Sequence, residues 1–195
     1  MSHGKMMISA YDPCPCKSGK KFKYCCQIIL KEKNSSELIK VTNKWPVCNC
    51  WRLYEASQCH KVTVFVVRTI PNGNYILGSY LLDLLSLGIK DTFLAINLSK
   101  SNLTKYELFD ERISKELISY QDARSLILGS LAFAKKHGFA PHDNWEDSKC
   151  MIEPNDPYEA KFTFGLKGKS FYIPSIHDVG FEQTPNGKKV IIEYT

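Results

Sequence analysis

Residues 12–26 read DPCPCKSGKKFKYCC and hold four of the eight cysteines in this 195-residue chain. The four are Cys14, Cys16, Cys25 and Cys26, a Cys-x-Cys pair followed after eight residues by a Cys-Cys pair. Two close cysteine pairs can bring four thiolates to the corners of a tetrahedron, which is the geometry that Zn²⁺ prefers in structural sites. Ser18-Gly19 supplies a turn between the pairs. The spacing therefore predicts one zinc site.

This stretch resembles the SEC-C motif, which has a Cys-x-Cys pair, eight residues, and a closing Cys followed by Cys or His. The likeness includes the Ser-Gly-Lys-Lys turn that begins at Ser18 and the aromatic Tyr24 before the closing pair. It departs at Lys17, where the family usually carries Gly. The resemblance implies a zinc-binding module of about 30 residues. On the preprotein-translocase motor that module recruits an export chaperone and contacts acidic lipid. The resemblance therefore implies a binding role for the module, and it implies no activity for the other residues.

Two disulfides, or four unrelated thiols, are the alternatives for these cysteines. The N-terminus has no basic stretch followed by an apolar segment of the kind found in a secretory signal, so we expect a cytoplasmic protein. In a reducing compartment such clusters are more often metal sites than disulfides. A segment this short cannot bury enough apolar surface to fold alone, and a bound metal would supply the missing free energy.

The formal net charge of +6 is concentrated in the cysteine-rich segment. Residues 1–33 contain seven Lys and two acidic residues, whereas residues 34–195 contain 19 basic and 18 acidic residues. The residues that would form a cationic and aromatic surface are Lys17, Lys20, Lys21, Phe22, Lys23 and Tyr24. Such a surface could bind an acidic protein surface or a nucleic acid, or it could simply be solvated.

A polar break over residues 31–36 divides the sequence into a SEC-C-like module, residues 1–33, and a larger domain, residues 37–195. Ser35 or Ser36 could cap a short helix toward Val41. Residues 80–91 and 137–142 look like segments of bacterial proteins that carry SEC-C ahead of an α+β body, and this resemblance supports the division. No apolar run approaches the ~20 residues that a membrane span requires.

The larger domain has the pattern of an α+β fold with a largely antiparallel sheet. A hairpin is predicted from the β-branched run 61–70, the Asn-Gly turn 71–74 and the strand 75–77. A helix is predicted over 119–137, because Ser119 and Asp122 resemble a capping box. The other predicted elements are a short apolar helix over 80–87 (or a continued strand), a strand at 93–96, a helix within 102–117, and strands at 161–166, 170–173 and 189–194.

A second group repeats the spacing of the first motif: Cys48, Cys50, Cys59 and His60. His is an accepted fourth zinc ligand, so a second site is one interpretation. The intervening residues contain no glycine turn and no basic cluster, and free cysteines are often buried as small apolar residues. This favours packing beside Trp45 and Trp51 over metal binding.

An active site is not evident in the larger domain. The candidate polar residues are His142, Asp143, Glu146 and Asp147 after the long helix, with Asp83, Lys90, Asp91, His177 and Asp178 elsewhere. No nucleophile-base spacing or phosphate-binding loop accompanies them, so catalytic residues stay unassigned. The leading hypothesis is a zinc-dependent binding or adaptor protein. A metal-dependent hydrolase or nuclease targeted by the zinc module, and a purely structural interaction protein, are the alternatives.

Overall fold

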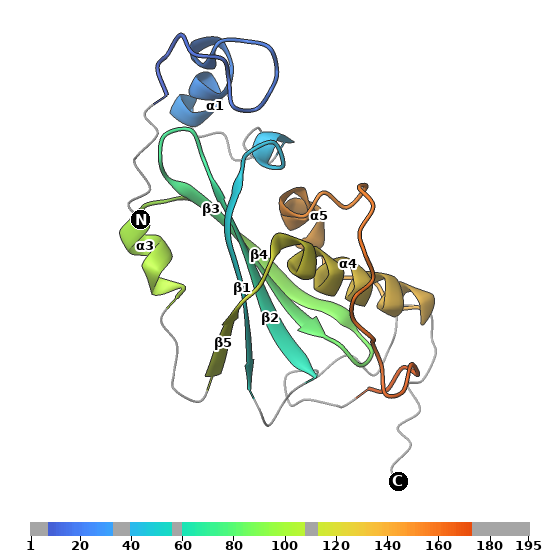
Figure 1. The fold of residues 1–195 in the computed structure, drawn as a ribbon. Helices are drawn as coiled ribbons and strands as arrows, with labels where there is room; N and C mark the ends of the chain where they lie inside the picture. Colours follow the sequence, from blue (N-terminus) through green and yellow to red (C-terminus); the bar gives the residue numbers. More distant parts are fainter. Residues whose placement is uncertain (1–7, 33–39, 56–59, 108–112, 173–195) are drawn as a thin grey trace.

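The computed structural model describes residues 8–32, 40–55, 60–107 and 113–172. They form a five-stranded antiparallel sheet with helices on both faces, and the cysteine-rich module lies at one end of the sheet (Figure 1). The predicted α+β class with an antiparallel sheet is therefore confirmed.

The sheet is a four-stranded meander to which a fifth strand returns. Its order is β4 (Gly88–Leu98), β3 (Tyr75–Asp83), β2 (Lys61–Thr69), β1 (Val47–Glu55) and β5 (Ile113–Leu117). The predicted hairpin is confirmed as β2 and β3, which pair from Lys61 opposite Asp83 to Thr69 opposite Tyr75. At its turn, Gly73 has a φ of 83° that a side chain would disfavour.

The predicted helix over 80–87 is wrong, and the alternative of a continued strand holds as far as Asp83. The Asp83 carboxylate then accepts hydrogen bonds from the backbone N–H groups of Leu85 and Ser86, both at 2.9 Å, and turns the chain. Gly88 has a φ of 67°, and a Cβ there would lie 2.8 Å from the Ser130 carbonyl oxygen. The turn therefore replaces the predicted helix because Asp83 caps backbone donors and Gly88 permits close packing against the long helix.

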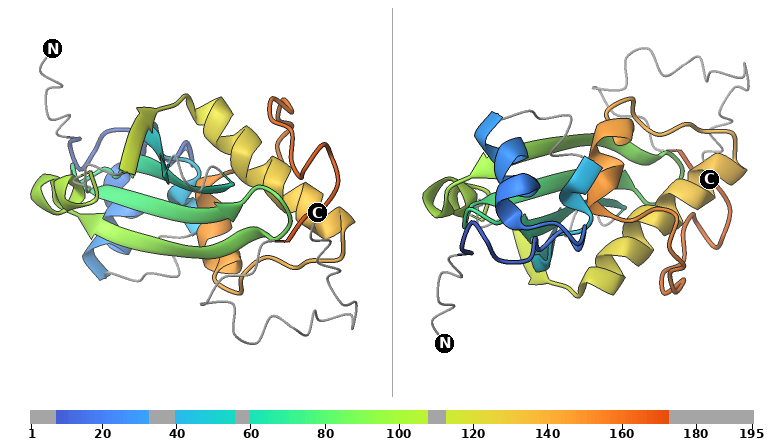
Figure 2. Two further views of the ribbon diagram at one scale, coloured as in Figure 1. Left: turned by 90° about the horizontal axis from the view of Figure 1, so that it is seen from below. Right: turned by 90° about the horizontal axis from the view of Figure 1, so that it is seen from above.

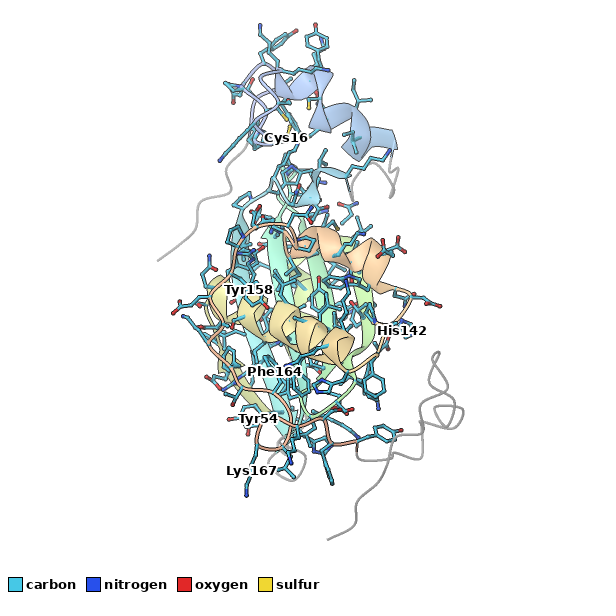
Figure 3. The ribbon with its side chains drawn as sticks, turned by 90° about the vertical axis from the view of Figure 1, so that its right-hand side faces the viewer. Cys16, Tyr54, His142, Tyr158, Phe164 and Lys167 are labelled. Carbon is cyan, nitrogen blue, oxygen red and sulfur yellow. The ribbon has the colours of Figure 1, made fainter. Side chains whose placement is uncertain are left out.

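The long helix α4 (Tyr120–Lys136) crosses one face of the sheet, beside the short α5 (Trp145–Ser148) (Figures 2 and 3). Its predicted cap is confirmed: the Ser119 hydroxyl oxygen accepts the Asp122 N–H at 3.0 Å and donates to the Asp122 carboxylate at 2.6 Å. On the opposite face, α3 (Lys100–Lys105) packs through Leu103. The predicted helix within 102–117 is thus confirmed over residues 102–105 and wrong over residues 113–117, which form strand β5, while residues 108–112 lie outside the described residues.

The last described segment has little regular structure. Residues 161–172 contain only an isolated bridge between Leu166 and Lys169 where strands at 161–166 and 170–173 were predicted. Residues 40–42 are helical, as expected for a helix running toward Val41. The predicted strand 189–194, with residues 35, 36 and 173, lies outside the described residues.

Two apolar clusters fill the two sides of the sheet. The larger lies on the α4 side and includes Trp45, Tyr80 and Ile127, and it extends into the module through Phe22 and Cys26. The smaller lies under α3 and consists of Trp51, Leu53, Phe65, Val67, Leu77 and Leu103. The module therefore shares an apolar contact network with the end of the sheet.

Two arginines are buried on the α4 side of the sheet. Arg124, on α4, donates hydrogen bonds to four backbone carbonyls, those of Ile152, Glu153, Asp156 and Pro157. Arg68, on β2, is 2% exposed and donates to the carbonyls of Asn43, Trp45 and Met151, to the Tyr120 hydroxyl and to the Glu153 carboxylate. These donors satisfy carbonyls in turns and irregular segments and at the end of the 3₁₀ helix η3 (Lys149–Met151).

Candidate metal centre

A small hairpin positions the first cysteine pair. Cys14 N–H donates to the Lys20 carbonyl at 2.9 Å, and Phe22 N–H donates to the Asp12 carbonyl at 2.9 Å. Between these rungs the chain turns through Lys17 and Gly19, whose φ values of 58° and 75° both fall in the left-handed region. The hairpin thus folds Cys14 and Cys16 back toward the residues that follow it.

The second pair comes from a helical turn. A 3₁₀ turn, η1 (Phe22–Tyr24), leads to Cys25, and Cys26 begins α1 (Cys26–Glu32). Phe22 is buried, so its ring anchors this turn in the apolar cluster instead of joining the cationic surface as predicted.

The four sulfur atoms converge as the spacing predicts. All four Sγ atoms lie within 4.8 Å of one another, and Cys16 Sγ lies 3.3 Å from Cys14 Sγ and 3.4 Å from Cys25 Sγ. Four thiolates around one zinc ion at ~2.3 Å would have S···S edges of ~3.8 Å. All four cysteines are free, so the disulfide alternative is not found. The donor set therefore fits one tetrahedral, thiolate-preferring ion.

The centre has the character of a structural site. Three of the cysteines are buried and Cys25 is half-buried. Four thiolates complete a tetrahedron, whereas catalytic zinc sites keep one position for water or substrate. The Ser18 hydroxyl lies 3.2 Å from Cys25 Sγ and so supports the ligand set from outside it. Such a centre would fix the hairpin to α1 and leave no position for a reacting group.

Burial shapes the acidity of the metal-free thiols. Desolvation by burial raises the pKa of Cys14 and of Cys26, and for Cys26 the neighbouring Cys14 and Cys16 add to the rise. Burial also acts to raise the pKa of Cys16, but hydrogen bonds from Ser18, Cys14 and Cys25 outweigh it and lower that pKa to about 6. At neutral pH the metal-free centre thus holds protons on at least two of its four sulfurs.

Metal binding is therefore expected to release protons. The bound form needs thiolates, and Cys14 and Cys26 keep their protons at pH 7 without metal, so lowering the pH favours the metal-free form. The apparent metal affinity should rise by about 100-fold or more per pH unit between pH 6.5 and 8, corresponding to at least two released protons. Competition titrations with a chromophoric chelator at several pH values measure this slope. A flat profile would contradict the acidity assigned to these thiols.

Lys17 has a left-handed backbone conformation, which glycine adopts at a lower conformational energy than lysine. A residue with a side chain pays about 1 kcal/mol to adopt the left-handed conformation that Lys17 has. Lys17→Gly should therefore tighten metal binding by up to about fivefold, after the entropy cost of glycine is subtracted. Lys20→Gly is the matched control, because Lys20 has no positive φ and glycine there only loosens the unfolded chain. Equal weakening by both substitutions would show that the turn at Lys17 is not strained.

The second cysteine pattern does not assemble. Cys48 and Cys50 lie on β1, and Cys50 pairs with Val66, six residues along β2 from His60, which is ~20 Å at strand spacing. Cys50 is buried, and the Cys48 thiol donates weakly to the Val67 carbonyl at 3.6 Å. Cys59 lies outside the described residues. His60 is therefore too far from both cysteines to share an ion with them.

The acidic residues after α4 do not form a metal centre either. Among the described residues, the four motif cysteines are the only group of three or more His, Cys, Asp or Glu side chains close enough to hold one ion. His142 accepts a hydrogen bond from Asn144 N–H at 3.2 Å and lies 3.8 Å from Asp91, while Glu146 pairs with Lys149. Figure 3 shows that His142 lies on the larger domain, well away from Cys16 in the module. His177 and Asp178 lie outside the described residues.

The cationic surface of the module is built around an aromatic residue that the sequence interpretation missed. Lys21 and Lys23 place their ammonium groups 5.6 Å and 5.1 Å from the centre of the Tyr11 ring, and Lys23 also donates to the Tyr11 hydroxyl at 3.3 Å. Tyr11 and Tyr24 are both 59% exposed. A hollow of about 300 Å³ lies between Tyr11, Lys23 and Ile28. The sequence signal for this role of Tyr11 was its position directly before the motif, which begins at Asp12.

A comparison with protein-family models bears on this part of the chain alone. Residues 12–28 match the SEC-C motif. The match covers all four cysteines that converge in the structure, so the family pattern and the geometry point to the same four residues. Neither the curated proteins nor the solved structures gave a match to the chain. The SEC-C motif is therefore the feature from which function can be argued.

Proposed function

We propose that this chain is a zinc-binding protein whose SEC-C module, residues 1–33, binds an acidic partner and is carried by an α+β domain, residues 37–195. The convergence of four cysteine sulfurs within 4.8 Å supports the metal part of the proposal. Zn²⁺ is the ion because closed tetrahedral thiolate sites of this ligand spacing are typical of structural zinc. A reducing compartment such as the cytoplasm would keep the thiols available for the metal.

The basic surface supports the partner-binding part. Lys17, Lys20, Lys21 and Lys23 are exposed on a segment that carries most of the net charge. Long-range attraction would orient an acidic partner toward this surface, and the exposed Tyr11 and Tyr24 would add apolar contact area on arrival. In the described part of the chain, no helix is long and apolar enough to cross a membrane.

The partner is an acidic protein surface or a nucleic acid, and the two differ in their response to salt. Nucleic-acid binding weakens steeply with salt because each lysine-phosphate contact releases condensed counterions. Removing one such contact should reduce the slope of log affinity against log salt by about one unit. A protein partner should show a shallower dependence, due to screening alone.

A charge-reversal variant tests recognition through the module. Lys20→Glu, Lys21→Glu and Lys23→Glu together should leave the metal content unchanged, because these side chains are not ligands, but reduce partner binding at least about 100-fold through like-charge repulsion. The matched control reverses three lysines of the larger domain, Lys100, Lys105 and Lys115, and should keep the partner. Undiminished binding by the module variant would move recognition to the larger domain.

A hydrolase or nuclease would need a metal site in the larger domain. It requires His142, Asp143 and Glu146 to converge around an ion, and among the described residues they form no such group. Asp83, another candidate base, is occupied in capping the backbone of Leu85 and Ser86.

A further inference from the structure

The face of the sheet opposite α4 is covered by α3 over only part of its length. Near α3, alternate residues of β2 and β3 such as Val67 and Leu77 are fully buried. Toward the start of β2, on the same face, Lys61 and Thr63 are only half-buried. A groove of about 470 Å³ lies over this part of the sheet, which is within the size range of small-molecule sites.

The floor of the groove holds a hydroxyl without a partner. Ser79 is 4% exposed, lies at the centre of the sheet on β3, and lines the groove. Within the described part of the chain the structure gives its side-chain oxygen no hydrogen bond. The Ser79 oxygen is not among the described buried side-chain atoms that lack a partner, which are Trp45 Nε1, Trp51 Nε1 and His60 Nε2, so it is accessible from the groove and could exchange water for a ligand atom. Thr63 on β2 lies opposite Leu81, two residues along β3 from Ser79, and adds a second hydroxyl to the groove.

The aromatic ring of Phe93 lines the groove beside Ser79. Phe93 is the cross-strand neighbour of Ser79 on β4, and its ring is held from the far side by Tyr106 at 6.0 Å between ring centres. Phe93 is nevertheless 42% exposed, which is unusual for a phenylalanine on a sheet. Neighbouring strands are ~4.8 Å apart, so a flat ring above Ser79 would lie within the 4.5–7 Å range of aromatic pairs.

The charges at the rim are unequal. Lys61 lines one side and lies opposite Asp83 on β3, whose carboxylate caps the backbone of Leu85 and Ser86; the described residues place no carboxylate within 4.0 Å of the Lys61 ammonium. Asp91 lines the other side, but its carboxylate accepts the Thr92 N–H at 2.7 Å and lies 3.8 Å from His142. Asp91 is also two strands away from Lys61, which is ~10 Å across the sheet. The rim therefore offers a cation to a ligand, while its anion is already engaged.

We propose that this groove binds a small planar aromatic anion, with its ring against Phe93, a polar atom at Ser79 and its carboxylate or phosphate at Lys61. The inference is independent of the zinc module, because the groove contains none of the module's residues. It assigns to the α+β domain a ligand-binding role that the SEC-C motif does not provide.

Fluorescence and calorimetric titrations of the full-length, metal-loaded protein test the site. The probes are 2-naphthoate, 1-naphthyl phosphate and the neutral 2-naphthalenemethanol. We expect saturable one-to-one binding of at least one anion, and about tenfold weaker binding of the neutral probe. The better anion identifies whether the natural group is a carboxylate or a phosphate. Absence of saturable binding of both anions up to a few millimolar would overturn the proposal.

Variants locate the ligand within the groove. Lys61→Gln should weaken anion binding about tenfold and leave the neutral probe unaffected, whereas Phe93→Ala and Ser79→Ala should weaken all probes by threefold or more. The matched controls are Lys135→Gln at the end of α4 and Leu166→Ala, an exposed apolar residue outside the groove. Thermal unfolding midpoints within a few degrees of the wild type show that each variant is folded, and Lys61→Gln, a surface change, keeps the test decisive if Ser79→Ala is unstable.

Two results would contradict the assignment even if a probe binds. Equal losses in the groove variants and in the controls would mean non-specific adsorption. Concentration-dependent dimerisation that Phe93→Ala abolishes would mean that the groove receives a second copy of the chain and not a small anion.

Discussion

Replacing Cys16 by Ser is expected to abolish metal binding and to unfold residues 12–32 while leaving the larger domain folded. Apparent zinc-binding free energies of ~10–16 kcal/mol supply the folding free energy of modules this small, and a hydroxyl in place of one thiolate breaks the tetrahedral set. Elemental analysis should give one zinc per wild-type chain and close to none for the variant. Circular dichroism should lose the signal of α1 alone.

Cys48→Ser is the matched control for this prediction, since Cys48 lies on β1 away from the centre. It should keep one zinc per chain. Two zinc ions per wild-type chain, one of them surviving in Cys16→Ser, would contradict a single site. A chain that begins at Glu37 should retain a cooperative transition, with a lower midpoint because the larger apolar cluster loses the members that the module contributes, such as Phe22. If chelation abolished the transition of the whole protein, the two parts would be one folding unit.

The convergence of the four cysteines could be predicted from the sequence because they are close along the chain. The eight residues between the two pairs contain Gly19 and fold back locally, and zinc is proposed from the thiolate set without any knowledge of the rest of the fold. The pattern from Cys48 to His60 has the same spacing and fails. There residues 51–55 continue strand β1, which pairs with β2 so that Cys50 lies opposite Val66, and the sheet holds both cysteines away from His60. Ligand spacing is informative only when the segment between is free to turn.

The fold was predictable where local signals agree with the tertiary packing. Asn72-Gly73 fixed the hairpin, and Ser119 with Asp122 fixed the start of α4. The run from Tyr80 to Leu87 misled because apolar residues that are buried on both faces of a strand resemble a buried helix. Only the sheet partners β2 and β4 decide between the two, and they are distant in sequence.

No sequence pattern predicts the groove or the hydrogen-bond partners of the buried arginines. Ser79 and Phe93 become neighbours through strand pairing, and each is an ordinary residue of a strand in the sequence. Arg68 carries a weak signal, because a charge inside the apolar run from Val62 to Ile70 has to find partners when that run is buried. Those partners are backbone carbonyls from other parts of the chain, which no pattern in the sequence specifies.

Arg68→Ala is expected to lower the free energy of unfolding by about 3–5 kcal/mol. The guanidinium donates to three backbone carbonyls, one of them Trp45 at 2.6 Å, and to the Glu153 carboxylate at 2.8 Å. Without it these acceptors are buried with fewer partners or none, and each loss costs the desolvation of that group. Urea unfolding followed by tryptophan fluorescence measures the change, since Trp45 is both a reporter and one of the residues that Arg68 holds.

Arg68→Lys and Arg52→Ala separate the hydrogen-bond network from charge alone. Lysine keeps the charge but cannot reproduce a fork that reaches carbonyls on both sides, so Arg68→Lys should still lose about 2 kcal/mol or more. Arg52 forms a partly exposed ion pair with Glu116 on the neighbouring strand, and its removal should cost about 1 kcal/mol. If Arg68→Ala cost no more than Arg52→Ala, the carbonyls that Arg68 contacts would be satisfied by water. Arg68 would then not be what fixes the segments around Trp45 and Met151 to the sheet.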